Sequence, residues 1–399
     1  MSAISKETQR LLGSGSTLRA MFEEGKKMVK IYGADDVFDF SLGNPSVPAP
    51  ESIRNAMEDA LENTESMKLH GYMSNAGFEE SRQAVCDDLK KRYGASYAPK
   101  NIFMTTGAAN AVVLALKVML DPGDEVLVLA PFFLEYRNYV GSFCGKTVVV
   151  PANPPTFMPD TDQIAAAITP RTKAVIINNP NNPSGVVYGE ETVRRLAAVL
   201  EAKQKEFKTT IYLISDEPYR EIVYDGVQVP FIPKYYSNTL IAYSYSKSMS
   251  IPGERIGYLV MPDEIDESDS FIAGAAVSMR AIGSVNAPSL QQLAIIRAMA
   301  QLCDFEEYGR NRKRLLEIMD KAGFEYVYPQ GTFYLFMKTP EEDDRAFVAR
   351  AKDDHHLLLS AGSAFECPGY VRIAYCVPYD RIDRSESRFI ALAHAYGLN

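Results

Sequence analysis

Six short apolar runs, separated by stretches with helical periodicity, constrain the fold of this 399-residue chain most strongly. They occupy residues 125–133, 146–151, 173–180, 210–219, 239–248 and 255–262. Their β-branched, nearly continuous apolar composition predicts strands buried on both faces of a sheet. Between two of them, residues 191–207 place Val193, Leu196, Ala197 and Leu200 on one helical face. Strands that alternate with helices predict βαβ units and a mostly parallel sheet.

The two ends of the chain predict a second, smaller unit. Residues 287–323 have a helical pattern, and the segments YVYPQGTFYLFMK and GYVRIAYCV alternate as half-exposed antiparallel strands do. The N-terminal segment combines a helix with the irregular DFSLGNPSVPAP, which we expect to pack on the small domain or on a partner. We predict an α/β fold with an N-terminal arm (1–48), a large domain with a mostly parallel sheet covered by helices (49–290) and a small α+β domain (291–399).

The composition disfavours several functional classes. The net charge of -9 argues against nucleic acid and anionic membranes as main partners, because both require a basic face. No apolar run approaches the roughly 18 residues of a transmembrane helix, and no secretory signal is visible. Five cysteines without a CxxC pair predict free thiols in the cytoplasm. The four histidines lack metal-ligand spacing, so we expect no metal site.

Small and polar residues follow the predicted strands, at the edge where open parallel sheets bind ligands. TTGAAN (105–110) opens a helix, and its small side chains let an anion approach the backbone N–H groups. Asp216 ends the apolar run TIYLIS, so its carboxylate needs a cationic partner. Asn182 lies between prolines in a rigid segment, and Lys247 stands among serines after another strand.

Each of these features has a structural interpretation when it is taken alone. The helix start and the Asn182 segment are compatible with plain turns, Asp216 with a buried ion pair, and Lys247 with a solvated surface group. Together, an anion site, a buried Asp, a fixed Asn, an aromatic residue and a lysine suit a phosphorylated, flat, cationic heteroaromatic aldehyde. Pyridoxal phosphate has all of these parts.

Eight segments carry a resemblance to the fold-type-I, class I/II aminotransferases, the aspartate-aminotransferase-like family. SYSKSMSIPGERIG resembles the family's S-x-S-K-x-x-x-x-x-G-x-R-x-G motif, and NNPNNPSG, DEPY and PFFLEY resemble its N-P-x-N-P-[ST]-G, D-E-x-Y and P-x-[aromatic]-x-x-Y motifs. TTGAANAV, YMSNAG, SLGNPSVPAP and VRIAY resemble further family segments. The matches follow the family order and span residues 41–375.

The resemblance implies a cofactor site. Lys247 would form a Schiff base with pyridoxal 5'-phosphate and then shuttle a proton, which requires a lowered lysine pKa. Asp216 would pair with the ring nitrogen. The implied catalytic residues are Lys247, Asp216 and Tyr219. The other implied contacts are to the ring face, the 3-oxygen and the phosphate. Phe133 would contact the ring face, and Asn182 and Tyr219 would bond the 3-oxygen. The residues that would hold the phosphate are Ala108, Ala109, Ser244, Ser246 and Arg255.

The resemblance also implies a substrate site and a homodimer. Arg372 would hold the substrate α-carboxylate in a bidentate fork, with Gly43 and Asn182 nearby. Tyr72 would reach the phosphate bound by the neighbouring subunit, so that the two subunits share their sites. The implied reaction is a ping-pong exchange between an L-amino acid and a 2-oxo acid. Aspartate, or a related small amino acid, with 2-oxoglutarate is the expected pair.

Substrate choice stays open at this point. A dicarboxylate needs a second cation, for which Arg280 is a candidate, with Arg54 and Lys68 as others. Phe133 stands where the family often has Tyr or Trp, and Asn44 where relatives commonly have Glu. Two alternatives share these motifs. One is a β-lyase acting on cystathionine-like substrates on the same scaffold, and the other is a regulator that binds the cofactor without turnover.

Overall fold

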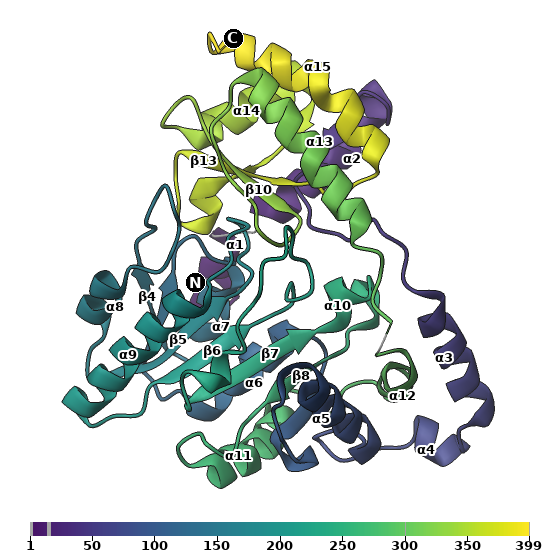
Figure 1. Ribbon diagram of the computed structural model, residues 1–399, viewed down its shortest axis with the longest axis vertical. Helices are drawn as coiled ribbons and strands as arrows, with labels where there is room; N and C mark the ends of the chain where they lie inside the picture. Colours follow the sequence, from purple (N-terminus) through teal and green to yellow (C-terminus); the bar gives the residue numbers. More distant parts are fainter. Residues whose placement is uncertain (1–2, 14–16, 300, 399) are drawn as a thin grey trace.

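The computed structural model describes residues 3–13, 17–299 and 301–398, which form a large and a small part along the long axis of the molecule (Figure 1). The strands of the large part are β2 (Ile102–Thr105), β3 (Glu125–Leu129), β4 (Lys146–Val150), β5 (Thr172–Asn178), β6 (Tyr212–Asp216), β7 (Thr239–Ser244) and β8 (Gly257–Val260). Its helices are α3 (Glu51–Asn63), α4 (Ser66–His70), α5 (Glu79–Tyr93), α6 (Ala108–Met119), α7 (Glu135–Gly141), α8 (Thr161–Ala167), α9 (Glu190–Phe207), α10 (Tyr245–Ser248), α11 (Ser268–Ala281) and α12 (Ser289–Ala298).

The described strands of the large part form one sheet in the order β2-β8-β7-β6-β5-β3-β4. Only β8 runs against its neighbours β2 and β7, which confirms the predicted mostly parallel sheet. Several strands are shorter than the apolar runs that predicted them: the run 210–219 leaves the sheet at Asp216, and 239–248 turns into α10 after Ser244. The residues beyond these ends instead form a turn after β6 and the short helix α10 after β7, both at the carboxyl edge.

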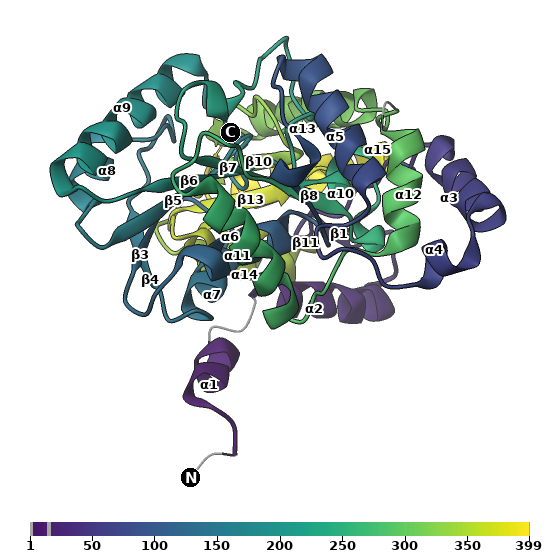
Figure 2. The same ribbon diagram turned by 90° about the horizontal axis from the view of Figure 1, so that it is seen from below.

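Helices cover both faces of this sheet, as the continuous apolar strands predicted. Helices α6, α7 and α11 pack on one face against side chains such as Val126 and Ile176. On the other face, α8 and α9 cover one end, whereas α3, α5 and α12 cover the opposite end (Figures 1 and 2). The predicted apolar face of α9, from Val193 to Leu200, is buried. The four residues of that face are therefore correctly predicted.

The small part contains α2 (Thr17–Tyr32), β1 (Phe38–Asp39), α13 (Glu306–Ala322), β9 (Tyr326–Val327), β10 (Tyr334–Lys338), α14 (Asp344–His355), β11 (Leu357–Leu358), β12 (Ser360–Ala361), β13 (Tyr370–Ala374) and α15 (Tyr379–Ala395). Its main sheet is antiparallel, in the order β12-β13-β10-β9. Strand β1 pairs in parallel with β11, so the N-terminal segment packs on the small part, as expected. Helix α1 (Lys6–Gly13) projects away from both parts (Figure 2).

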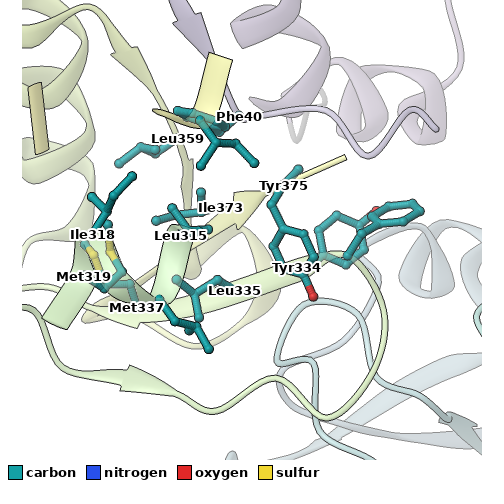
Figure 3. Close-up of a cluster of buried hydrophobic side chains, with 14 of the residues drawn as sticks. Phe40, Leu315, Ile318, Met319, Tyr334, Leu335, Met337, Leu359, Ile373 and Tyr375 are labelled. Carbon is teal, nitrogen blue, oxygen red and sulfur yellow. The ribbon is translucent and has the colours of Figure 1, made fainter. Parts of the chain in front are cut away.

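Two expectations for this region were wrong. Strands β10 and β13 are not half-exposed: Leu335 and Met337 pack in the core with α13 and Phe40 (Figure 3), while Phe336 packs against Phe157 of the large part. The second face is buried because the large part covers it, which strand alternation cannot reveal. The helical pattern at 287–323 is also interrupted, since α12 packs on α3 and α13 packs on α15. The predicted domain limits remain a prediction.

Three further findings concern expected absences. None of the described helices is long and apolar enough to cross a membrane. Within the described ranges, no group of three or more His, Cys, Asp or Glu side chains is arranged to hold a metal ion. All five cysteines are free thiols.

Candidate active site

A cavity of about 280 Å³ lies at the carboxyl edge of the large sheet, beneath residues of the small part. Strands β2, β5, β6 and β7 all end at it, because parallel strands bring the loops that follow them to one edge. The cavity collects all but one of the predicted site residues. They are Gly43, Ala108, Ala109, Phe133, Asn182, Asp216, Tyr219, Ser244, Ser246, Lys247, Arg255 and Arg372.

Lys247 lies on α10, one turn beyond the end of β7. Its Nζ donates a hydrogen bond to the carbonyl oxygen of Gly43 at 2.8 Å and stands 5.5 Å from the centre of the Phe333 ring. Burial lowers the pKa of Lys247 to about 8, and the positive charges of Arg372 and Arg255 act in the same direction. The side chain therefore changes its protonation near neutral pH, as a nucleophile and proton shuttle must.

Asp216 is the last residue of β6 and is buried. The Tyr136 hydroxyl donates a hydrogen bond to its Oδ2, whereas Oδ1 has no hydrogen-bond partner. Burial raises the pKa of Asp216 to about 7, and the hydrogen bond from Tyr136 opposes that rise. A buried carboxylate oxygen without a partner is costly, so this position suits a cationic N–H donor from a ligand.

A buried ion pair supports the turn that carries Asp216 and Tyr219. Glu217 accepts hydrogen bonds from Ser215 Oγ and from Arg220 Nη1, both at 2.7 Å. Arg220 also donates from Nε to the Tyr93 hydroxyl at 2.7 Å. The two charges neutralise each other inside the protein, where an unpaired charge would be strongly destabilising. The acidic Glu217 next to Asp216 is thus a structural residue that holds the turn.

The N-terminus of α6 forms an anion-binding cradle. Ala108 and Ala109 open the helix, and the preceding Gly107 has a φ of 98°. A Cβ at Gly107 would lie 3.2 Å from Nη2 of Arg255 and 3.3 Å from Oγ of Ser244. Free backbone N–H groups, a hydroxyl and a guanidinium therefore converge on one small space, which is the donor set that a phosphate group takes.

Hydrogen bonds hold two members of this cradle in place. Arg255 donates from Nη2 to the Thr106 carbonyl at 3.0 Å and from Nη1 to the Pro252 carbonyl at 2.8 Å. Ser244 caps α10 by accepting from the backbone N–H of Ser246 at 3.2 Å, and its hydroxyl lies 2.8 Å from that of Ser246. Both serines predicted at the phosphate therefore line the cavity, with Ser244 nearer to Gly107.

Arg372 approaches from β13 of the small part and is 3% exposed. Its Nη1 donates to Oδ1 of Asn182 at 3.0 Å and its Nη2 to the carbonyl of Ser41 at 2.7 Å, whereas Nε has no partner. The guanidinium lies 4.4 Å from the ring centre of Tyr334 and 4.8 Å from that of Phe365. A buried arginine that lines a cavity and keeps one unsatisfied N–H suits a carboxylate ligand.

Several lining residues were missed by the sequence interpretation. They are Leu42, Val112, Tyr136, Tyr139, Asn178, Pro218, Pro252 and Tyr334. Tyr136 and Asn178 stand inside the quoted segments PFFLEY and NNPNNPSG, so those motifs could have indicated them. Asn178 accepts the backbone N–H of Asn182 at 2.7 Å, and Tyr136 lies edge-on to Phe133. Tyr334 comes from a strand of the small part and had no local signal.

Tyr72 is the one predicted site residue that lies outside the cavity. It follows α4 and is 96% exposed. Near it in sequence, Asn75 accepts a hydrogen bond at 2.9 Å from Arg280, so these segments share one surface. Neither Arg280, Arg54 nor Lys68 lines the cavity, and the last two pair with acidic neighbours. A single chain thus brings none of these candidate cations to the site.

Residues 35–386 match the family Aminotransferase class I and II. The chain belongs to this family. A probable aspartate/prephenate aminotransferase of Thermus aquaticus is 32% identical over 369 residues, covering 89% of this chain and 91% of that protein. A crystal structure of an amino transferase from Eubacterium rectale has a TM-score of 0.96 and 42% identity, covering 99% of this chain and 100% of that one. Aspartate aminotransferase from Thermus thermophilus with maleate has a TM-score of 0.85 and 28% identity, covering 98% and 100%.

The aminotransferase is therefore an enzyme that uses pyridoxal 5'-phosphate, which confirms the predicted family, fold, reaction class and cofactor. The cavity fits that cofactor. The unpaired Oδ1 of Asp216 suits a protonated ring nitrogen, and the cradle at Gly107 suits its phosphate. Lys247 lines the same cavity with a lowered pKa. The roles of the individual residues remain predictions.

Proposed function

We propose that this aminotransferase transfers the amino group of aspartate to 2-oxoglutarate, with each predicted side chain in the role that its position supports. Bound pyridoxal phosphate supplies an electron sink for the electrons released at the substrate Cα. The observation that carries the proposal is the convergence of Lys247, Asp216 and Arg372 on one cavity. Their properties differ: a titratable amine, a buried carboxylate and a fixed guanidinium.

Different side chains bind different parts of the reacting molecules. Arg372 orients the α-carboxylate of the amino acid, with Asn182 fixing the guanidinium by its hydrogen bond. Lys247 moves the proton at the substrate Cα, because its pKa of about 8 permits it to accept and return a proton near neutral pH. Asp216 would pair with the protonated ring nitrogen of the cofactor, and Tyr219 would donate a hydrogen bond to its 3-oxygen.

The choice of aspartate as the amino donor is based on the names of similar proteins and not on a residue that lines the cavity. Similar proteins are named aspartate/prephenate or aspartate aminotransferases, and the Thermus thermophilus structure holds maleate, a dicarboxylate. Among the described residues, Lys247, Arg255 and Arg372 are the cations that line the cavity. All three have roles, so a second carboxylate needs a cation from another chain. We assign this role to Arg280, on the surface that also carries Tyr72.

A panel of amino donors with 2-oxoglutarate tests the substrate. We expect oxaloacetate from aspartate, and we expect Arg280→Ala to raise the KM for aspartate roughly tenfold while the KM for alanine stays unchanged. Alanine or aromatic donors that react while aspartate does not would overturn the assignment. Ammonia and pyruvate released from a β-substituted amino acid without any oxo acid would instead indicate a β-lyase. Cofactor binding without any turnover would indicate a regulator.

We further propose a homodimer that shares its sites through Tyr72. The proposal is supported by the exposed side chains of Leu61 (54%), Met67 (75%) and Tyr72 (96%) at the edge formed by α3 and α4 (Figure 1). Exposed large apolar groups at one edge are typical of surfaces that a partner covers. The five free thiols support a reducing compartment, so we place the dimer in the cytoplasm.

Mixed dimers test the sharing directly. A subunit with Lys247→Ala and a subunit with Tyr72→Ala each give impaired homodimers. If Tyr72 acts across the interface, the mixed dimer contains one site with both side chains intact, and activity should rise to about half of the wild-type value per dimer. If Tyr72 acts within its own chain, or not at all, mixing restores nothing beyond the average of the two homodimers.

A further inference from the structure

Tyr334 touches two of the proposed site residues at once. It begins β10 in the small part and is 2% exposed. Its hydroxyl oxygen lies 3.1 Å from the hydroxyl oxygen of Tyr219, and its ring centre lies 4.4 Å from the guanidinium carbon of Arg372. A Cβ at Gly43 would fall 1.8 Å from the Tyr334 hydroxyl, so glycine at 43 leaves the room that this hydroxyl occupies.

Only one of the two hydroxyls can donate the hydrogen bond between them. Burial raises the pKa of Tyr219 well above 10 and also raises that of Tyr334, so both remain protonated at neutral pH. Each hydroxyl then has a single proton to donate. If Tyr219 donates its proton to the 3-oxygen of the cofactor, the remaining contact requires Tyr334 to donate to Tyr219. The positive charge of Arg372 lowers the pKa of both hydroxyls, but burial leaves the pKa of Tyr219 further above its ordinary value, so the Tyr334 hydroxyl is the stronger donor.

We propose that Tyr334 is a positioning residue with two separable functions. Its hydroxyl donates to Tyr219 and thereby directs the proton of Tyr219 to the 3-oxygen of the cofactor. Its ring packs against Arg372 and holds the guanidinium for the substrate carboxylate. The inference rests on the proposed roles of Tyr219 and Arg372. It adds a side chain from the small part that connects the cofactor end of the site with the substrate end.

Tyr334→Phe separates the hydroxyl from the ring. Without the donated hydrogen bond, Tyr219 donates less strongly, and the 3-oxygen keeps more negative charge. That charge holds the neighbouring proton on the nitrogen of Lys247 more tightly. We therefore expect the pH midpoint of the cofactor's visible absorbance in the loaded enzyme to rise by roughly 0.5 unit, while the KM for the amino acid changes less than about twofold.

Tyr334→Leu removes the ring as well. Loss of the cation–π contact should release Arg372 and raise the KM for amino acid and 2-oxo acid about tenfold above that of Tyr334→Phe. Tyr379→Phe, on an exposed tyrosine at the start of α15, is the matched control and should change neither quantity. Thermal unfolding of each loaded variant checks that the fold is retained.

Tyr219→Phe completes the test as a double-mutant cycle. It should raise the same midpoint further than Tyr334→Phe does, and adding Tyr334→Phe to it should produce no additional shift. An unchanged midpoint in Tyr334→Phe, or a shift that adds fully to that of Tyr219→Phe, overturns the inference about Tyr334 and leaves the proposed role of Tyr219 in place. If Tyr219→Phe leaves the midpoint unmoved, the proposed role of Tyr219 fails, and the relay through Tyr334 fails with it.

Discussion

Tyr136 donates a hydrogen bond to one carboxylate oxygen of Asp216, and the other oxygen of that carboxylate has no partner. The two residues come from different segments, 80 positions apart, and meet at the carboxyl edge of the sheet. Tyr136 therefore fixes the orientation of Asp216 and leaves its second oxygen without a partner, as the proposed pairing with the ring nitrogen of the cofactor requires. Because the site is buried, a hydrogen bond here changes the protonation of Asp216 more than it would at the surface.

Tyr136→Phe should weaken cofactor binding near neutral pH. Burial holds the pKa of Asp216 at about 7, and the hydrogen bond from Tyr136 lowers it. Removing that bond raises the pKa further, so a smaller fraction of Asp216 carries the charge that the ring nitrogen needs. Titration of the apoenzyme with pyridoxal phosphate should give a several-fold weaker affinity at pH 7 that recovers at higher pH. An affinity loss that is constant with pH would contradict this account.

Asp216→Asn should stabilise the apoenzyme at alkaline pH. The folded pKa of about 7 lies above the unfolded value, so the stability due to the neutral carboxyl is present below about pH 4 and is lost as pH rises through 7. The side-chain amide of the variant would remain neutral throughout. Denaturant unfolding of the apo forms should show a gain on the order of 1–4 kcal/mol at pH 8 and little at pH 4. The loaded enzyme should lose stability on the same substitution, because the cofactor loses its counter-charge.

The pKa of Lys247 sets the pH at which the apoenzyme takes up its cofactor. Only the neutral amine attacks an aldehyde, and burial lowers the pKa of Lys247 to about 8. The uptake rate should therefore rise with pH to a midpoint near 8, rather than near 10.4 as for an exposed lysine. Lys247→Ala should abolish covalent attachment of the cofactor and lower transamination by more than about 10⁴-fold. Lys205→Ala, on the exposed face of α9, should change neither. Full turnover in Lys247→Ala would refute the assignment.

Gly43→Ala should damage the site through Tyr334. The added Cβ would fall 1.8 Å from the Tyr334 hydroxyl, so the tyrosine must move, and overpacking of this kind costs about 1–3 kcal/mol of folding free energy. Activity should fall together with stability. Gly309→Ala is the matched control, because nothing lies within 4 Å of the new Cβ on α13. That change should raise stability by about 0.5–1 kcal/mol, since alanine is favoured over glycine within a helix.

The residues around Lys247 show how much of the site the local sequence could predict. Asp216 and Ser244 end two strands of the sheet, Asn182 follows a third, and Arg255 precedes the antiparallel strand β8. All four therefore lie at the edge where the carboxyl ends of the parallel strands meet. Strands with continuous apolar character therefore determined both the sheet and the location of its ligand site. Motif spacing added the predicted roles of Lys247 and of the phosphate and carboxylate partners, and all of these residues except Tyr72 line one cavity.

Tertiary structure alone decided the contacts that join distant segments. Tyr334 and Tyr219 are 115 residues apart, and no periodicity links a strand of the small part to a turn of the large one. The packing of Phe336 against Phe157 and the separation of α12 from α13 also depend on contacts between segments that are distant in the sequence. Hydrophobic pattern reports that a face is covered, but not what covers it, because burial is non-directional. Directional hydrogen bonds, such as that from Tyr136 to Asp216, form only after packing has brought their partners together.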